Sequence, residues 1–192
     1  MSDMELSPAA REALLTIAYQ TVCDFVMGRQ MRHTSIEDPQ LAQHAGAFVT
    51  LLRHGDLRGC IGRIQADQPV WRVVQQMAIS AAQSDPRFYP LGSDELDDLE
   101  VEISLLSPLR KITSIDEIEV GKHGLMITQG FHRGLLLPQV AGERDWDRDT
   151  FLDATCDKAG LPPDAWRKGA IIEKFSAQVF GKTFGIHVHA NN

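Results

Sequence analysis

Hydrophobic positions along the chain follow two periods, one typical of helices and one of strands. Between residues 9 and 27, apolar side chains recur every three or four positions, which predicts an amphipathic helix. Ser7 and Pro8 precede it, and serine at the N-cap with proline in the first turn is a favoured helix start. The same period predicts helices over residues 69–83, opening after a cap at Asp67, and over 145–160.

Strand patterns occupy much of the remaining chain. The apolar run 47–52 and the segment 57–64 flank the turn residues 54–56, and together they predict a β-hairpin. Residues 99–106 alternate polar and apolar, which predicts an antiparallel strand with one polar face. Further strands are predicted at 123–128, 135–137, 173–180 and 183–189. Strands and helices alternate irregularly, so we expect an α+β fold with a largely antiparallel sheet and flanking helices.

Composition adds a size class and excludes several kinds of function. The 192 residues are 43% apolar and 23% charged, which predicts a single globular domain over 1–192, with room for two lobes. A net charge of -7 argues against a nucleic-acid partner. The sequence has no apolar run that could span a bilayer, no signal-peptide core and only three scattered cysteines. We therefore expect a cytoplasmic protein without a membrane partner.

The second strand of the predicted hairpin begins with the hexapeptide 57–62, Leu-Arg-Gly-Cys-Ile-Gly. Alternate residues of a strand share a face, so Leu57 and Ile61 are expected on one face and the even-numbered residues on the other. Arg58 and Cys60 would then lie side by side. A guanidinium near a thiol favours the thiolate, the reactive form of cysteine.

The hexapeptide therefore allows two interpretations. Gly59 and Gly62 lack side chains, as in a strand that a ligand or another backbone approaches closely. In the first interpretation, Cys60 is reactive. In the second it only packs, as most free cysteines do. The spacing alone leaves both open.

Several other motifs stand in a fixed order around the hexapeptide. They are Gly46–Leu51, Asp85–Phe88 with Pro90, Glu102–Ser104 with Leu106–Pro108, His123–Leu125, Gly134–Ala141, Trp146, Phe151–Leu152, Cys156 and Lys158–Leu161. Together with Leu-Arg-Gly-Cys-Ile-Gly they resemble the AMMECR1 domain family, called AmmeMemoRadiSam system protein A in bacteria and archaea. The resemblance covers roughly residues 10–182. One departure is Ala82-Gln83-Ser84, where the family has a more basic lead-in.

The resemblance implies a fold and a setting, because the family has no established biochemical activity. The implied fold is α+β with two unequal lobes and a cleft between them. Prokaryotic members are often encoded beside, or fused to, a Memo-like domain and a radical S-adenosylmethionine (SAM) protein. This chain has no three-cysteine iron–sulfur cluster, so radical chemistry would belong to a partner. The resemblance implies a component of a modification pathway, with no cofactor of its own indicated.

Two hypotheses for the function follow. In the first, Cys60 is a nucleophile or covalent acceptor, Arg58 biases it or holds an anion, and His123 or Glu102 transfers protons. Glu102 would reach Arg58 if its strand neighbours that of Cys60. In the second, the same cleft binds a peptide or protein and Cys60 is structural. The candidate binding residues are Arg58, Gly59, Gly62, Asp85, Arg87, Phe88, Ser104, Gln139 and Glu143.

Each remaining candidate also has a simpler interpretation. The loop at 85–90 would either carry function or only satisfy backbone groups. A histidine such as His123 is often hydrogen-bonded in a turn, and Cys156 falls on the apolar face of its helix, which predicts a core position. His187 and His189 would share a strand face, but no third ligand is implied nearby, so no metal site is expected.

Overall fold

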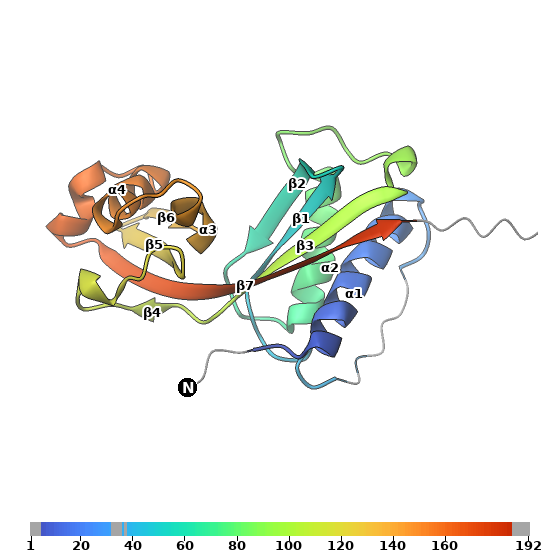
Figure 1. Cartoon of the computed structure of the whole chain (residues 1–192), viewed down its shortest axis with the longest axis horizontal. Helices are drawn as coiled ribbons and strands as arrows, with labels where there is room; N and C mark the ends of the chain where they lie inside the picture. The colour runs from blue at the N-terminus through green and yellow to red at the C-terminus, as the bar shows by residue number, and fades with distance from the viewer. Residues whose placement is uncertain (1–4, 32–35, 37, 186–192) are drawn as a thin grey trace, which may run out of the picture. The chain divides into compact units, whose positions relative to one another are not determined.

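The computed structural model describes residues 5–31, 36 and 38–185 of the chain (Figure 1). The chain divides into two compact units, which are considered one at a time. Among the described residues, the larger unit contains those up to Leu105 together with 178–185, and the smaller unit contains Leu106–Ala177.

The larger unit packs two helices against a mostly antiparallel sheet. Its elements are α1 (Pro8–Val26), β1 (Ala47–Arg53), β2 (Asp56–Arg63), α2 (Val70–Gln83), the 3-10 helix η1 (Ser93–Glu95), β3 (Asp98–Leu106) and the second half of β7 (Ile171–Gly185). The strand order is β2-β1-β3-β7, and β1 pairs antiparallel with both β2 and β3. The edge strand β2 therefore carries the hexapeptide.

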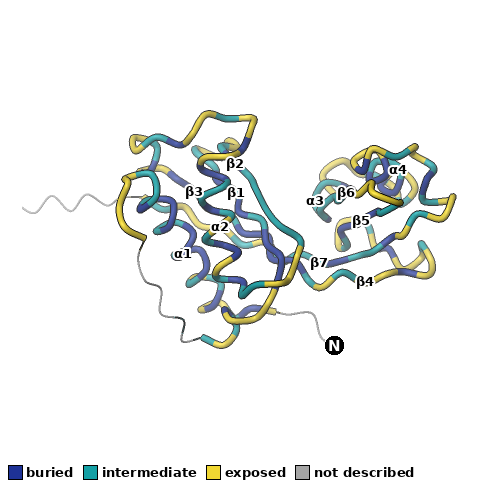
Figure 2. Tube along the Cα trace, turned by 180° about the vertical axis from the view of Figure 1, so that it is seen from behind, coloured by how far each residue is buried: buried dark blue, intermediate teal, exposed yellow. Residues whose placement is uncertain are grey.

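The core of the larger unit lies between the sheet and the two helices. Val49 and Leu51 of β1 are fully buried, as are Val73, Val74 and Ala78 of α2. Figure 2 shows the trace of the chain coloured by burial, with the buried segments in dark blue. The alternate residues of β1 face the other way. One face of this sheet is thus packed on helices, and the opposite face carries Thr50 together with the partly exposed Phe48 and Leu52.

The predicted hairpin is present, with an irregularity that the sequence does not reveal. His54 and Gly55 have φ of 54° and 82°, which is the left-handed pair required by a two-residue hairpin turn. The register shifts between Leu51 and Leu52, so that Leu51 pairs with Gly59 but Leu52 pairs with Leu57. This bulge moves Leu57 to the face of Cys60, where it is 41% exposed. The expectation that Leu57 shares a face with Ile61 is therefore wrong.

The smaller unit has its own sheet and its own core. Its elements are β4 (Arg110–Lys111), η2 (Ile115–Glu117), β5 (His123–Gln129), β6 (His132–Leu136), α3 (Pro138–Gly142), α4 (Arg148–Lys158), η3 (Pro163–Lys168) and the first half of β7. β5 lies between β7 and β6, and β4 pairs with the other edge of β7. Phe151, Leu152 and Cys156 of α4 are fully buried in this core, so the prediction that Cys156 packs is confirmed.

The α+β fold with a largely antiparallel sheet is confirmed, with local corrections. β6 begins at His132 rather than 135, because the turn before it is only two residues long. The two strands predicted at 173–180 and 183–189 are one strand, β7. Gly181 does not interrupt it, since a side chain there would lie 3.2 Å from the Val101 carbonyl and glycine permits this close approach to β3. His187 and His189 lie outside the described residues.

Two helix starts also differ from the prediction. α2 is capped by Pro69 rather than Asp67, whose carboxylate instead accepts hydrogen bonds from Arg63 at 2.8 Å. α4 begins three residues later than predicted, because Asp147 is its N-cap and accepts a hydrogen bond from the backbone N–H of Thr150. α1 begins as predicted, at Pro8 with Ser7 as N-cap.

Candidate functional site

Cys60 lies in a row of three side chains that crosses the polar face of the larger unit's sheet. The register pairs Cys60 of β2 with Thr50 of β1, and Thr50 with Glu102 of β3. Directly paired residues of antiparallel strands share a face. The neighbouring Gly59 faces α2, because a side chain there would meet the Ala81 carbonyl oxygen at 2.2 Å. The row therefore lies on the side away from the helices.

The Thr50 hydroxyl contacts the half-buried Cys60 sulfur directly. Oγ1 of Thr50 donates a hydrogen bond to Sγ of Cys60 at 3.2 Å. The backbone explains this proximity: the Cys60 N–H points to the open edge of β2, so the two residues form a non-hydrogen-bonded pair, the kind whose side chains lie closest.

Asp85 occupies the open edge of β2. Its Oδ2 accepts the Cys60 N–H at 2.8 Å, and its carboxylate also accepts two hydrogen bonds from the Arg87 guanidinium, at 2.9 and 2.7 Å. The Asp85 side chain is 2% exposed, so it is an ionised group held almost without water. The Arg87 guanidinium holds the pKa of the Asp85 carboxyl well below its usual range, against the opposite effect of burial.

Asp85 thereby fixes a cation near the thiol. The pKa of Arg87 is raised, chiefly by its hydrogen bonds to Asp85, and the Cys60 sulfur adds an electrostatic contribution in the same direction. The simpler alternative for the 85–90 loop is observed, and its functional role stays a prediction. Asp85 satisfies the backbone N–H groups of Cys60 and Arg87, and the same contacts hold the guanidinium within electrostatic reach of the Cys60 sulfur.

Arg58 anchors the following loop instead of pairing with Glu102. Its guanidinium binds the Glu95 carboxylate through two hydrogen bonds, at 2.7 and 2.9 Å, and donates to the carbonyl oxygens of Tyr89 and Pro90. These hydrogen bonds from Arg58 are the main cause that lowers the pKa of Glu95. The expected contact with Glu102 is wrong, since β1 lies between the two strands.

Phe88 links the two arginines of the site. The Arg58 and Arg87 guanidinium carbons lie 5.9 and 5.5 Å from the centre of its ring, within cation–π range. Gly62 makes room for the Phe48 ring, because a Cβ at position 62 would lie 2.2 Å from that ring. Gly59 and Gly62 thus serve close packing of the protein with itself.

The remaining sequence-predicted candidates fall elsewhere. Ser104 is buried on β3, paired with Phe48. His123, Gln139 and Glu143 belong to the smaller unit. Nδ1 of His123 accepts the Glu119 N–H at 3.0 Å, which is the turn contact considered as its simpler interpretation. That His123 reaches Cys60 stays a prediction, as does a cleft between two lobes that Gln139 and Glu143 help to line.

Two residues of the site are absent from the sequence-based candidates, Thr50 and Glu95. A two-residue turn that pairs Arg53 with Asp56 would, without a bulge, place Thr50 opposite Gly59. The bulge moves it opposite Cys60. Glu95 has one signal in the sequence: it lies three residues after Gly92, the position from which a glutamate can cap the start of a helical turn. In the structure, its Oε2 accepts the Gly92 N–H at 2.8 Å.

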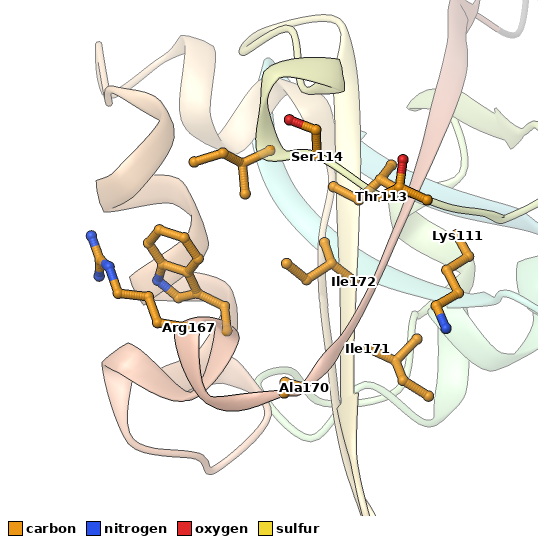
Figure 3. Close-up of a pocket in the computed structure, with 11 residues that line it drawn as sticks. Lys111, Thr113, Ser114, Arg167, Ala170, Ile171 and Ile172 are labelled. Atoms are coloured by element: carbon orange, nitrogen blue, oxygen red, sulfur yellow. The ribbon is translucent and has the colours of Figure 1, made fainter.

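The smaller unit contains a separate hollow of about 310 Å³ (Figure 3). Ile172 lies at its centre in this view, and Ser114 and Arg167 lie on different sides of it. Eleven residues line it: Lys111, Ile112, Thr113, Ser114, Ile115, Trp166, Arg167, Gly169, Ala170, Ile171 and Ile172. The Arg167 guanidinium stacks on the Trp166 ring at 3.8 Å, and the indole N–H binds Asp153 at 2.7 Å. This hollow is preformed and partly apolar.

The described residues contain neither a membrane-spanning helix nor a cluster of metal ligands. No helix among them is long and apolar enough to cross a membrane. Within the same residues, no group of three or more histidine, cysteine, aspartate or glutamate side chains is arranged to hold a metal ion.

Comparison with known proteins places the chain in a family. A Methanosarcina acetivorans protein is 48% identical over 147 residues, 74% of each chain, and a Thermococcus onnurineus protein is 40% identical over 185 residues, 90% of each. The crystal structure of an uncharacterized protein from Pyrococcus horikoshii, 37% identical, superposes with a TM-score of 0.82 over 89% of this chain and 90% of that one. The AMMECR1 family model matches residues 15–180. The chain therefore belongs to the AMMECR1 family.

Proposed function

We propose that this AMMECR1-family protein is a component of a modification pathway in which Cys60 accepts a group covalently. The observation that supports this most directly is the double use of the Asp85 carboxylate, which binds the Cys60 N–H and the Arg87 guanidinium at once. A half-buried thiol thus has a fixed cation nearby and a hydroxyl donor 3.2 Å from its sulfur. Guanidinium groups and hydrogen-bond donors are the surroundings that activate cysteine.

The proposed step is a nucleophilic substitution or acyl transfer. The Cys60 thiolate attacks an electrophilic carbon of the substrate, an S–C bond forms, and the leaving group departs with the electron pair of the bond that breaks. The thiol proton moves to a base, for which Glu102 is the candidate in the row beyond Thr50. The proposed partners, Memo-like and radical SAM proteins, rest on the family resemblance alone.

The test is the rate of Cys60 alkylation by iodoacetamide in the folded protein, measured by mass spectrometry of peptides. Cys156 is an internal control, because it is fully buried in the other unit and should label only on unfolding. We expect Cys60 to label rapidly near neutral pH. Thr50→Val keeps the shape but removes the hydroxyl donor, and should slow labelling several-fold, since one such hydrogen bond contributes about 1 kcal/mol.

The matched control for Thr50→Val is Thr183→Val, on the described end of β7 and exposed. It should leave the Cys60 rate unchanged. If Cys60 labels no faster than Cys156 until urea unfolds the chain, Cys60 is structural and the proposed chemistry is wrong.

The preformed hollow of the smaller unit favours a second candidate, a binding module without catalysis. Its apolar members Ile115, Trp166 and Ile172 border the unit's core, and Ile171 is 44% exposed beside them. In this case a peptide or protein segment would place an apolar side chain against Trp166. Slow Cys60 labelling together with a change in Trp166 fluorescence on adding a partner would support this function over the first.

A further inference from the structure

The second half of β7, residues 178–185, forms one edge of the larger unit's sheet (Figure 1). β3 pairs with one side of β7, and β5 pairs with the other side only at residues 171–176. Beyond that point, no strand among the described residues pairs with the second side of β7. The sheet of the larger unit therefore ends in two edge strands, β2 and this half of β7.

The backbone groups that face this open edge belong to the odd-numbered residues. The Ser176 carbonyl accepts the Ser107 N–H at 2.9 Å, so Ser176 directs its backbone groups toward the β3 side. Successive residues of a strand direct these groups to opposite sides. The N–H and C=O groups of Val179, Gly181 and Thr183 therefore point away from β3. Val179 is 46% exposed, and Gly181 and Thr183 are exposed as well.

The two edges of the sheet differ in their protection. An unpaired strand edge is a template for pairing with another chain, and proteins block such edges with charged side chains, prolines, bulges or covering loops. At β2, the Asp85 carboxylate accepts the Cys60 N–H at 2.8 Å, and the strand contains a bulge. Residues 178–185 of β7 contain no proline and a single charged residue, Lys182.

Lys182 is held away from the open edge. Its ammonium forms an ion pair with Glu12 of α1 and lies 5.3 Å from the centre of the Phe184 ring. Phe184 in turn stacks on Tyr19 of α1. The lysine is thereby directed to the helix-covered face, and its charge is compensated within the same chain. Charge therefore opposes the approach of another strand only weakly.

We propose that this edge pairs with the same edge of a second copy of the chain, as antiparallel strands related by a two-fold axis at Gly181. Such an interface uses the same patch on both copies, so the patch must be self-complementary. Val179 would lie directly opposite the partner's Thr183, which pairs two β-branched side chains. The N–H and C=O groups of Val179, Gly181 and Thr183 would bond those of the partner and continue the sheet across both copies.

The neighbouring registers are less favourable. A register centred one residue later would place Lys182 directly opposite the partner's Lys182, and like charges in this position destabilise a strand pair. A register centred one residue earlier would place Val179 opposite the partner's Gly181, which offers no side chain to pack against. Around Gly181, each Lys182 instead lies opposite the partner's uncharged Phe180. The proposal is independent of the chemistry at Cys60, which lies on the opposite edge of the sheet.

The first measurement is the mass of the full chain in solution, by sedimentation equilibrium over a range of concentrations. We expect a reversible equilibrium between monomer and dimer. Thr183→Pro removes an N–H that faces the open edge, where strands tolerate proline. It should weaken the dimer about thirtyfold, because each dimer loses two hydrogen bonds of about 1 kcal/mol each. Circular dichroism verifies that the variant is folded.

The matched control is Thr183→Val, which keeps the N–H and the branched shape at the same position. It should change the dissociation constant of the dimer by about twofold at most, as for a surface substitution. A chain that stays monomeric at every concentration, or equal weakening by the two variants, would overturn the proposal.

Disulfide formation tests the register without the proline variant. Val179→Cys and Thr183→Cys are prepared in separate chains that also carry Cys23→Ser and Cys60→Ser, and are mixed under mild oxidation. Residues directly opposite in a hydrogen-bonded pair have Cα atoms about 5.5 Å apart, within disulfide range.

The mixture of the two cysteine variants should therefore form cross-linked dimers. Either variant alone should not, because its two cysteines would lie about 13 Å apart along the paired strands. Cross-linking of one variant by itself, or no cross-linking in the mixture, would overturn the two-fold pairing at Gly181.

Discussion

At the scale of single residues, the site depends on one buried carboxylate. Asp85 accepts hydrogen bonds from the Cys60 N–H and from both the backbone and side chain of Arg87. The carboxylate satisfies an edge N–H that would otherwise point to solvent, and it orients a cation. The stability of the larger unit and the surroundings of Cys60 are therefore coupled through the same side chain.

We predict that Asp85→Asn lowers the free energy of unfolding by about 2 kcal/mol at pH 7. The amide keeps the shape and can still accept one hydrogen bond, but it loses the charge-assisted pair with Arg87, and hydrogen bonds to charged groups contribute about 1.5–3 kcal/mol. Urea unfolding followed by circular dichroism gives this value. Asp67→Asn is the matched control, because it breaks an ion pair whose aspartate is 57% exposed and should cost below about 1 kcal/mol.

The loss in the free energy of unfolding caused by Asp85→Asn should also depend on pH. The pKa of Asp85 is lowered in the folded state, so its contribution to stability is present above its usual value of about 4 and is lost as the pH falls. The difference between the two proteins should be constant from neutral pH to about 5 and should shrink below about 4. A difference that grows in acid would contradict this assignment.

At the scale of elements, the sequence predicts what local rules determine. α1 follows from its cap and period, and the β1–β2 hairpin follows from an apolar run and the segment 57–64 on either side of a turn. The bulge at Arg58 is not predictable from the alternation, because one inserted residue leaves the local composition unchanged. The insertion of β1 between β2 and β3 is a long-range pairing, so the sequence could not show that Glu102 is separated from Arg58.

The sequence predicts the candidate site only where local motifs determine it. Cys60, Asp85, Arg87 and Phe88 were found through motifs, and the structure brings them together on β2 and the adjoining loop. Thr50 was missed because its place opposite Cys60 depends on the bulge.

The packing of β2 on α2 leads to a prediction for Gly59. A Cβ at this position would lie 2.2 Å from the Ala81 carbonyl oxygen, and both partners are backbone that can move only by separating strand and helix. Gly59→Ala should destabilise the chain by about 2 kcal/mol. Overpacking costs about 1–3 kcal/mol, whereas the lower entropy of the unfolded alanine chain stabilises the folded state by less than about 1 kcal/mol. Thermal and urea unfolding measure this difference.

The same substitution elsewhere should have the opposite sign. Gly142 is the last residue of α3, and the nearest atom to an added Cβ is 3.6 Å away. Gly142→Ala should therefore stabilise the chain by about 0.5 kcal/mol, because alanine fits the helix and restricts the unfolded state. If both variants have equal stability, the close contact of Gly59 with α2 is wrong.

At the scale of the whole molecule, ionisable groups limit stability at both ends of the pH range. In acid, the lowered pKa values of Asp85 and Glu95 mean that protonation removes stabilising contacts. In base, burial raises the pKa of the Cys156 thiol and of the Tyr19 phenol. Both must lose a proton when the chain unfolds at high pH, so stability falls there.

Tyr19 provides the sharpest test of the alkaline limb. Burial, and then a hydrogen bond with Cys23, raises the pKa of Tyr19 to about 12, and its ring stacks on Phe184 at 4.2 Å. The folded state holds the proton more tightly than the unfolded chain, whose tyrosines titrate near 10. The stability that depends on this proton is therefore complete below about pH 10 and is lost as the pH rises toward about 12.

We predict that Tyr19→Phe, which keeps the stacked ring, loses less stability than the unmutated chain as the pH rises above about 10. The difference in the free energy of unfolding between pH 10 and 12 should be about 1 kcal/mol, because solvent screens a half-buried group. Rapid urea unfolding at a series of pH values measures the two slopes. Tyr89→Phe is the matched control, because Tyr89 is 90% exposed and its surroundings change little on unfolding. Identical slopes for Tyr19→Phe and the unmutated chain would show that α1 and the end of β7 do not shield the phenol, whereas a flatter slope in Tyr19→Phe alone would tie the alkaline limit of the molecule to that contact.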